Sequence, residues 1–591
     1  MRPRLSRWLP LVVVALLTAA VYGWRLGAAP IYVSPDEAII AVDAHALATT
    51  GVDVHGRFLP LYFQVQLPGE TRMGWFTPAI FYLSAIVDQV LPFSEATIRM
   101  PTVIVAIADV VLIYLAAMRL FRARWLAIAA ALMLATTPAH FMLGRYGLDY
   151  LYPLPFVLGW LVCLLIYLDT DRVRWLAAAA ALLGVGFFSY IAAVVMMPLY
   201  LLVTWLVVAR KPQPLRLWAA SAAAFAVPLL PLVPWLMRHP TAVVDTIARY
   251  DLYDTKSLNV LQGIRSFFSF PNVERLAASY WTFFSPAFLF FSGDRQVMFS
   301  TRTTGVFLLP LIVLLVVGLR YVLIEWKQPR LLILLVGFLT APLAALLGAE
   351  DGAITRAVEL LPFTILIATC GLEFLWNLSA PPAPRAAVIG VAVTLLAIAV
   401  PYGAWAAVAR GRLAVTALGL GVFAGAAIVT APAVGRFPSS RVAAGVVLAL
   451  MTAQLAWFTR DYFTDYRLRS SAWLGGNLRG ALEELIAMDA HDHPPRIYFS
   501  ILASTSGLMD IRNRWMSSYW DFYLIKHRRR DLLDRTAALD LARLADVPPG
   551  SLVLANIGET NTGALVRSGA LTVARVIPEV QGEPFFQILK R

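Results

Sequence analysis

The chain has 591 residues, of which 59% are hydrophobic and 14% charged, and its mean hydropathy is +0.70. A soluble globular domain of this size does not have such a composition, so the sequence predicts a polytopic α-helical membrane protein. The net charge of +13 does not indicate nucleic-acid binding, because Lys and Arg fall in short clusters between apolar runs. Both cysteines, Cys163 and Cys370, lie inside such runs, and no disulfide is expected.

Apolar runs of about 20 residues, the length that crosses a bilayer, predict about thirteen transmembrane helices. The first run follows a basic N-terminus and ends without a good cleavage site, so we expect an uncleaved first span. The expected spans are 9–26, 99–120, 125–142, 149–168, 173–188, 190–209, 215–237, 301–325, 331–348, 355–377, 386–408, 413–432 and 441–459.

The segment 75–91 is apolar enough to be a further span, but the basic residues argue against it. Lys and Arg collect on the cytoplasmic side of membrane proteins. If 75–91 does not span, six basic clusters fall on one side, and if it spans, all but the first of them fall outside. These clusters are Arg2/Arg4/Arg7, Arg119/Arg122/Arg124, Arg172/Arg174, Arg210/Lys211/Arg216, Lys327/Arg330 and Arg436/Arg441. We therefore expect a juxtamembrane helix on the outer surface.

This topology predicts a transmembrane core over 1–459 with two large outer loops, 27–97 and 238–300. Residues 460–591 change in character and predict a small C-terminal α/β domain, also outside. Helices are expected near 473–488 and 513–526, and strands at 496–502, 551–556, 571–577 and 584–589.

Two adjacent carboxylates, Asp36 and Glu37, follow the first span directly. One interpretation is structural, because Ser34-Pro35-Asp36-Glu37 is a good helix N-terminus whose dipole favours acidic residues. The other is functional, and polar residues expected at the same level of the membrane favour it, because the cost of a charged side chain is high at the bilayer centre but smaller at the interface.

Further polar residues are expected at the same level of the membrane. One outer turn holds His140, Arg145, Tyr146 and Asp149, and another holds Arg356 beside an acidic pair, Glu350 and Asp351. Carboxylates and arginines from three turns can thus meet in one cavity, as a base and phosphate-binding guanidinium groups would.

Several motifs resemble the polyprenyl-phosphate-sugar-dependent glycosyltransferases of the C-type membrane class, which include the protein O-mannosyltransferases and the lipid A aminoarabinose transferase. The motifs are Asp36-Glu37, Trp75-Phe76-Thr77-Pro78, Ile98-Arg99-Met100-Pro101-Thr102, Arg119-Leu120-Phe121, Arg145 with Asp149, and Arg356 with Leu361-Pro362. The resemblance implies inverting transfer of a sugar from a polyprenyl-phosphate carrier, such as undecaprenyl phosphate, to a lipid, glycan or protein acceptor in a bacterial cell envelope.

The resemblance also implies roles for individual residues. The acidic residue of the first outer loop acts as the general base or beside it, so the role passes to Asp36, with Glu37 as its partner. Arg145 and Arg356 would stabilise the departing phosphate, with Arg72 in place of a lysine that the aminoarabinose transferase carries. Asp149, His140 and Tyr146 would support the site.

No metal or other cofactor is expected. His45 and His55 flank Asp53, but this spacing matches no known ligand pattern. The resemblance places the enzyme in the inner membrane, with its active site on the periplasmic side. The competing hypotheses are a transporter or flippase for lipid-linked glycans, which would hold its ionisable groups near the midplane, and a glycan polymerase.

Overall fold

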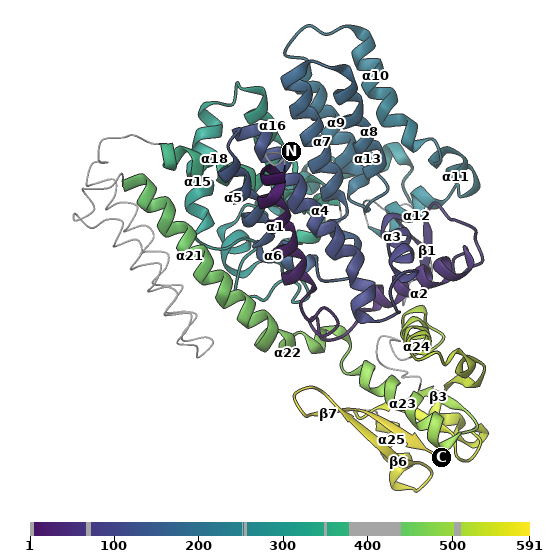
Figure 1. Cartoon of the computed structure of the whole chain (residues 1–591). Helices are drawn as coiled ribbons and strands as arrows, with labels where there is room; N and C mark the ends of the chain where they lie inside the picture. The colour runs from purple at the N-terminus through teal and green to yellow at the C-terminus, as the bar shows by residue number, and fades with distance from the viewer. Residues whose placement is uncertain are drawn as a thin grey trace.

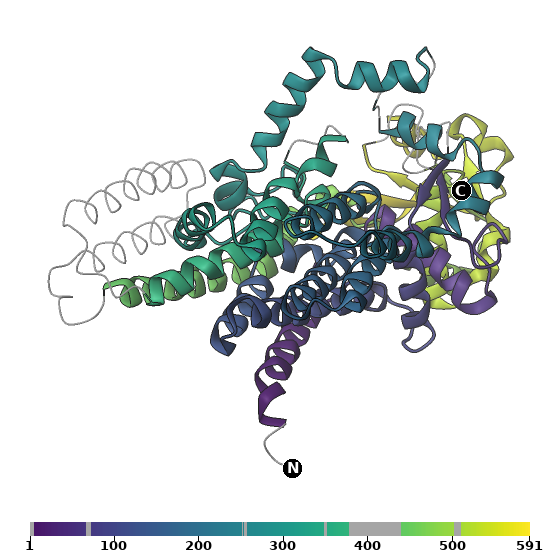
Figure 2. The same cartoon turned by 90° about the horizontal axis from the view of Figure 1, so that it is seen from above.

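A computed structural model of the chain describes residues 5–66, 73–250, 252, 257–347, 352–377, 439–500, 510–558 and 560–591. Its larger part is a bundle of helices, and a mixed β-sheet from the C-terminal residues lies at one end of that bundle (Figure 1). The view from above shows the bundle helices beside one another, with the C-terminus at one edge of the molecule (Figure 2).

The helices of the bundle differ widely in length. They are α1 (Leu5–Gly23), α4 (Glu95–Phe121), α5 (Arg124–Ala135), α6 (Pro138–Leu143), α7 (Pro153–Thr170), α8 (Val173–Gly186), α9 (Ala193–Val208), α10 (Leu215–Ala226), α11 (Leu232–Arg238), α15 (Leu311–Ile324), α16 (Pro329–Thr340), α17 (Leu343–Leu347), α18 (Leu360–Asn377) and α21 (Ser439–Asp461).

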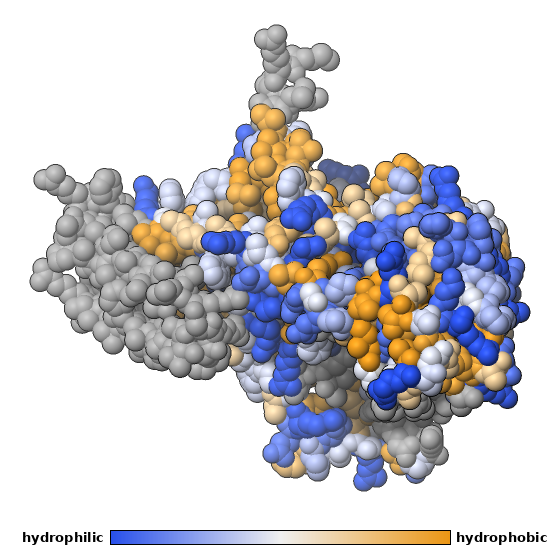
Figure 3. Space-filling view, turned by 90° about the horizontal axis from the view of Figure 1, so that it is seen from below, coloured by the Kyte–Doolittle hydropathy of each residue, from blue (hydrophilic) through white to orange (hydrophobic). Residues whose placement is uncertain are grey.

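Five of the described helical segments are long and apolar enough to cross a membrane, or six if the pair Leu215–Leu229 and Leu232–Arg238, bent by 45°, is one span. Six further apolar helices have 10–17 residues. These helices fit an integral membrane protein, and the exposed apolar side chains of α1 form a projecting stripe (Figure 3). The number of thirteen spans stays a prediction, since 386–408 and 413–432 lie outside the described residues.

Several helices are shorter than the expected spans, and prolines explain two of them. The helix α5 ends at Ala135, because Pro138 lacks an N–H and disfavours helical geometry in the residue before it. The helix α15 begins at Leu311, ten residues later than expected, directly after Pro310 at its N-cap. Both corrections follow from prolines inside apolar runs.

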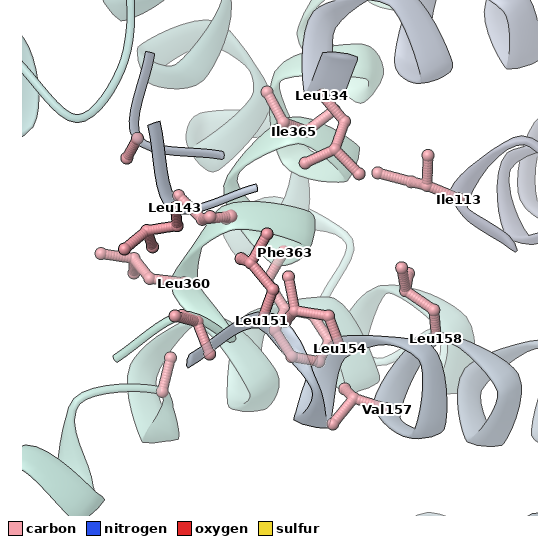
Figure 4. Packing of buried hydrophobic residues seen from close by; sticks show 14 of the residues in the cluster. Ile113, Leu134, Leu143, Leu151, Leu154, Val157, Leu158, Leu360, Phe363 and Ile365 are labelled. Carbon is pink, nitrogen blue, oxygen red and sulfur yellow. The ribbon is translucent and has the colours of Figure 1, made fainter. Parts of the chain in front are cut away.

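The core of the bundle is built from aliphatic side chains of α4, α5, α7 and α18. Figure 4 shows Ile113, Leu134, Leu154 and Phe363 from these four helices facing one another. All four are fully buried. Leu151 joins them from the 3₁₀ turn η1 (Asp149–Leu151), so the turn after α6 is anchored in the core.

Glycines bring α15 and α18 into backbone contact. A Cβ on Gly318 of α15 would run into the carbonyl oxygen of Ile367, and one on Gly371 of α18 into that of Leu314. Small residues allow this close approach between membrane helices, where van der Waals packing drives association.

The first loop after α1 contains short elements. They are α2 (Pro35–Thr50), the antiparallel hairpin β1 (Phe63–Gln66) and β2 (Met73–Phe76), and α3 (Ala79–Asp88). With 10 residues, α3 is about half the length a span needs, and the expectation that 75–91 does not cross the membrane stays a prediction. The second loop contains α12 (Ala242–Arg249), α13 (Val260–Phe267) and α14 (Phe270–Thr282).

The C-terminal residues form a five-stranded sheet in the order β4-β3-β5-β7-β6. The strands are β3 (Ile497–Ser500), β4 (Thr536–Leu539), β5 (Leu552–Asn556), β6 (Thr572–Pro578) and β7 (Pro584–Lys590), and the helices are α23 (Leu478–Asp492), α24 (Arg514–His527) and α25 (Thr560–Arg567). Strands β3, β4 and β5 are parallel, whereas β7 is antiparallel to both of its neighbours. Four strands lie where the sequence predicts them, and β4 is additional.

The helix α24 joins this sheet to the first loop. The Tyr519 hydroxyl donates to the carbonyl oxygen of Val33 at 2.8 Å, and Arg514 pairs with Asp43 of α2 at 3.1 Å. Buried side chains of α2 and α24 belong to one hydrophobic cluster. The C-terminal sheet is thus linked through α24 to the helix whose first turn contains Asp36.

The contact between α15 and α18 generates a prediction about stability. Gly318→Ala places a methyl group against the Ile367 carbonyl and should lower the thermal unfolding temperature of the purified protein. The control is Gly445→Ala on α21, where nothing lies within 4 Å of an added Cβ. That change should leave the unfolding temperature unchanged or raise it, because alanine favours helix. Equal effects of both substitutions would contradict the close packing.

Candidate active site

The acidic pair lies at the N-terminus of α2. Ser34 is the N-cap, and its hydroxyl accepts a hydrogen bond from the Glu37 backbone N–H at 3.3 Å. The Glu37 carboxylate in turn accepts from the Ser34 N–H at 2.8 Å, which completes a capping box. Pro35 occupies the first helical position, where no N–H is needed. The local sequence therefore sets where the helix starts, as the structural interpretation expects.

The Glu37 carboxylate is buried and fully engaged. Its Oε1 accepts from Arg99 Nε and from the Gly147 N–H, both at 2.8 Å, and its Oε2 also accepts from Arg99 at 3.3 Å. Arg99 is itself 0% exposed and donates its other N–H groups to the carbonyl oxygens of Leu26, Pro30 and Tyr32. With both oxygens occupied by donors, Glu37 has no position open for the proton of an incoming hydroxyl.

The Asp36 carboxylate has a different environment. It is part-exposed, and within the described chain it has no hydrogen-bond or ion-pair partner. Burial raises the pKa of Asp36 above its usual value, the Arg249 charge opposes this rise, and the Glu37 charge adds to it. A carboxylate with a raised pKa and free lone pairs has the properties of a general base.

Arg145 is also fully buried, and its guanidinium has no free donor. An arginine carries five N–H groups. In Arg145 they point at the Tyr462 hydroxyl and at the carbonyl oxygens of Val21, Tyr22, Trp24, Arg25 and Ala29. Three of these carbonyls end α1 or follow it directly, where helix carbonyls lack partners. In this structure Arg145 caps α1 and presents no N–H to a phosphate.

His140 and Tyr146 are 0% exposed as well. His140 lies between the Tyr22 hydroxyl, at 2.7 Å from Nδ1, and Asp109 Oδ2, at 3.3 Å from Nε2. Tyr146 packs edge-on against Phe299 with ring centroids 5.9 Å apart. Both predicted supporting residues therefore belong to the interior of the bundle.

Asp149 lies near both Arg356 and Asp36. The Asp149 carboxylate accepts from the Thr77 hydroxyl at 3.1 Å and is within electrostatic reach of both Asp36 and Arg356. Arg356, in the 3₁₀ turn η4 (Ile354–Arg356), donates to the Tyr190 hydroxyl at 2.7 Å. The structure thus brings three of the predicted residues into one neighbourhood.

An additional cation, Arg249, enters this neighbourhood from the end of α12. Its guanidinium lies 5.6 Å from the Phe76 ring centroid, next to Gly74, where a side chain would collide with it. In the part of the chain that the structure describes, it has no ion pair or hydrogen bond. Arg249 was not predicted from the sequence, because residues 238–300 offered no motif. Its one available sign was the amphipathic pattern of 242–249.

An apolar cavity of about 320 Å³ opens beside Arg356. Tyr250 lies over the guanidinium at 5.3 Å and also lines the cavity, so α12 connects Arg249 to this space. The lining residues are Tyr62, Trp75, Phe187, Ile191, Ala192, Val194, Val195, Leu232, Trp235, Leu236, Ala242, Val243, Thr246, Ile247, Tyr250, Leu252, Ala344, Leu347 and Arg356. A single cation at the edge of an aromatic and aliphatic cavity suits an amphiphile with an anionic head.

Some predicted residues are not brought to this site. Arg72, Glu350 and Asp351 lie outside the described residues. His45 pairs with Asp88, Asp53 pairs with Arg57, and the His55 ring lies 3.2 Å from the Gln64 carbonyl oxygen. Within the described residues no three His, Cys, Asp or Glu side chains gather in a way that could hold a metal ion.

Residues 76–237 match the family model described as dolichyl-phosphate-mannose-protein mannosyltransferase. This segment contains Thr77, Arg99, Arg145, Gly147 and Asp149. The resemblance to the C-type polyprenyl-phosphate-sugar glycosyltransferases is confirmed for this segment and, by solved structures, for the fold.

Two crystal structures of ArnT from Cupriavidus metallidurans share that fold. The one bound to undecaprenyl phosphate has a TM-score of 0.54 and 14% identity, over 98% of this chain and 97% of that chain. The apo structure has a TM-score of 0.54 and 12% identity, over 99% and 98% of the two chains. No curated protein matches the sequence.

The buried pair of Glu37 and Arg99 generates the second prediction. Arg99→Met should lower the free energy of unfolding by about 3–5 kcal/mol, because it leaves Glu37 buried without its counter-charge. The control is Arg122→Gln, whose side chain is 73% exposed and pairs with Asp169 at 3.3 Å. Chemical denaturation of both purified variants measures the difference. A control as unstable as Arg99→Met would contradict the special role of the buried pair.

Proposed function

We propose that the protein is an inverting glycosyltransferase that moves a sugar from a polyprenyl-phosphate carrier to an envelope acceptor at the outer face of the membrane. The observation that carries this proposal is the open carboxylate of Asp36, which lies near Arg249 and Asp149 beside a cavity edged by Arg356. The ArnT fold, seen with undecaprenyl phosphate in one crystal structure, supports the same type of donor.

In this proposal the donor binds with its chain in the apolar cavity and its phosphate at the guanidinium groups. Arg356 is held by Tyr190 and covered by Tyr250, so its donors are oriented before the substrate arrives. Arg249, next to Tyr250 in the chain, supplies a second positive charge. Aromatic and aliphatic side chains exclude water, which strengthens the attraction between these cations and the phosphate.

The chemical step is a single displacement. Asp36 takes the proton of the acceptor hydroxyl while its oxygen bonds to the anomeric carbon, and the bond from that carbon to the phosphate oxygen breaks. The electron pair leaves on the polyprenyl phosphate, where Arg356 and Arg249 stabilise the growing negative charge. One base and one displacement invert the configuration at the anomeric carbon.

Within this mechanism, Glu37 and Arg145 position the site rather than react. Glu37 fixes the start of α2 to Arg99 and Gly147, and Arg145 fixes the end of α1. The assignment of the base to Asp36 agrees with the sequence prediction, whereas these two roles differ from it. Asp149 holds Thr77 at the mouth of the site.

Asp36→Asn tests the proposed base. A general base contributes roughly 100-fold to 10,000-fold in rate, so the variant should lose at least about 100-fold of sugar transfer from a purified lipid-linked donor while keeping its unfolding temperature. The matched control is Asp534→Asn, an exposed carboxylate near β4. Full activity of Asp36→Asn would refute the assignment.

Arg249→Gln tests the electrostatics of the base. Asp36 must be ionised to work, so the rate falls as the pH drops below its pKa. Arg249 lowers that pKa, and its removal should move the acid limb of kcat/KM to higher pH. Arg249→Lys keeps the charge and should leave the limb in place. A limb that stays fixed in Arg249→Gln would show that Arg249 does not act on the base.

Labelling of single cysteines tests the orientation in the membrane. In a background without Cys163 and Cys370, a cysteine in place of Gln89, exposed at the end of α3, should react with an impermeant thiol reagent in intact cells. A cysteine in place of the exposed Lys211 should react only after permeabilisation. The reverse pattern would put the site on the cytoplasmic face.

A further inference from the structure

A second cleft, of about 550 Å³, lies between the first outer loop and the C-terminal sheet. His45 lines it from α2, nine residues after Asp36, which is half a turn away around the helix and about 14 Å along its axis. The cleft is therefore separate from the candidate active site. Its lining residues are His45, Ala48, Thr49, Asp88, Gln89, Leu91, Pro92, Phe93, Ile525, Lys526, Arg528 and Arg530.

The charge of this cleft is positive and not balanced internally. Its one carboxylate, Asp88, is 2.7 Å from His45, and Lys526 is held by Glu95 at 2.6 Å and Glu483 at 2.7 Å. The side chains of Arg528 and Arg530, by contrast, are exposed and form no ion pair or hydrogen bond with the described residues, although Asp521 lies within electrostatic reach of Arg530. Two guanidinium groups thus line the cleft without a paired anion.

Exposed apolar side chains lie next to the cleft at the end of α3 and just beyond it. Ile86 on α3 and Val90 after its end are four residues apart, with 59% and 78% exposure, and Leu91, which lines the cleft, is 39% exposed. A surface helix with such a face inserts into the headgroup and acyl boundary of a bilayer. Basic side chains next to apolar ones suit a phospholipid, because its phosphate can contact the basic groups while its acyl chains contact the apolar ones.

We propose that this cleft binds the headgroup of an anionic glycerophospholipid from the adjacent leaflet. The phosphate lies between Arg528 and Arg530, and the acyl chains lie along Val90 and Leu91. Since these cations directly follow α24, which packs on α2, the bound lipid holds the C-terminal sheet against the membrane at the helix that presents Asp36. The site concerns lipid binding and does not depend on the proposed transferase chemistry.

Native mass spectrometry of the full-length protein in detergent tests this site. Phosphatidylglycerol is titrated against the parent protein, against Arg528→Gln/Arg530→Gln, and against a control pair, Arg543→Gln/Arg567→Gln, whose arginines are exposed but outside the cleft. Each cation near a lipid surface contributes enough for about a 5-fold change, so the cleft variant should bind about 10- to 30-fold more weakly. The control pair should bind as the parent protein does.

Two further arms identify the ligand. Arg528→Lys/Arg530→Lys keeps both charges and should retain most of the phosphatidylglycerol binding, whereas phosphatidylcholine should bind weakly to every variant. Inorganic phosphate at millimolar concentration should not displace the lipid, because it lacks acyl chains. Equal phosphatidylglycerol binding by the cleft variant and the parent protein, or displacement by inorganic phosphate, would overturn the proposal.

Discussion

The position of the candidate base depends on how the buried backbone between α1 and α2 satisfies its carbonyl groups. This segment is irregular, and an irregular backbone buried at a membrane protein's core must find hydrogen-bond donors within the protein. Two buried arginines supply them. Arg145 donates hydrogen bonds to five carbonyl oxygens between Val21 and Ala29, and Arg99 donates to three between Leu26 and Tyr32. The loop is thereby held in one conformation, with the first turn of α2 at its end.

The two arginines differ in how their charge is compensated, and this explains the asymmetry of the acidic pair. Arg145 is surrounded by carbonyl dipoles and by the rings of Phe141, Tyr462 and Phe463. Arg99 forms an ion pair with Glu37, and the lone pairs of the Glu37 carboxylate are occupied by this ion pair, the Gly147 N–H and the helix cap. Asp36, one residue earlier, forms no hydrogen bond with these donors. Of the two neighbouring carboxylates, Glu37 thus stabilises the site and Asp36 remains available for reaction.

The sequence predicted the local features of this arrangement well. Ser34-Pro35-Asp36-Glu37 specifies a capped helix start through contacts within four residues, and the structure has it. The partner of Glu37 lies 62 residues away, so no local pattern could reveal that Glu37 is occupied. The partners of Arg145 could not be predicted either, because they are backbone carbonyl groups, which every residue carries. Its position at an outer turn suited a phosphate ligand equally well.

The missed elements have similar causes. The strand β4 is a four-residue edge strand of threonine, alanine and leucine, and only its parallel pairing with β3 defines it. Arg249 belongs to a short helix of the second outer loop and reaches the site because α12 packs near β2. Contacts between segments distant in sequence thus determined both features.

A structure of the protein with a non-transferable polyprenyl-phosphonate sugar analogue tests the central claim most directly. The account predicts phosphonate oxygens at about 3 Å from Arg356, with Asp36 facing the anomeric carbon and Glu37 still paired with Arg99. A phosphonate bound by Arg145, or a Glu37 carboxylate released from Arg99 and turned toward the sugar, would contradict it.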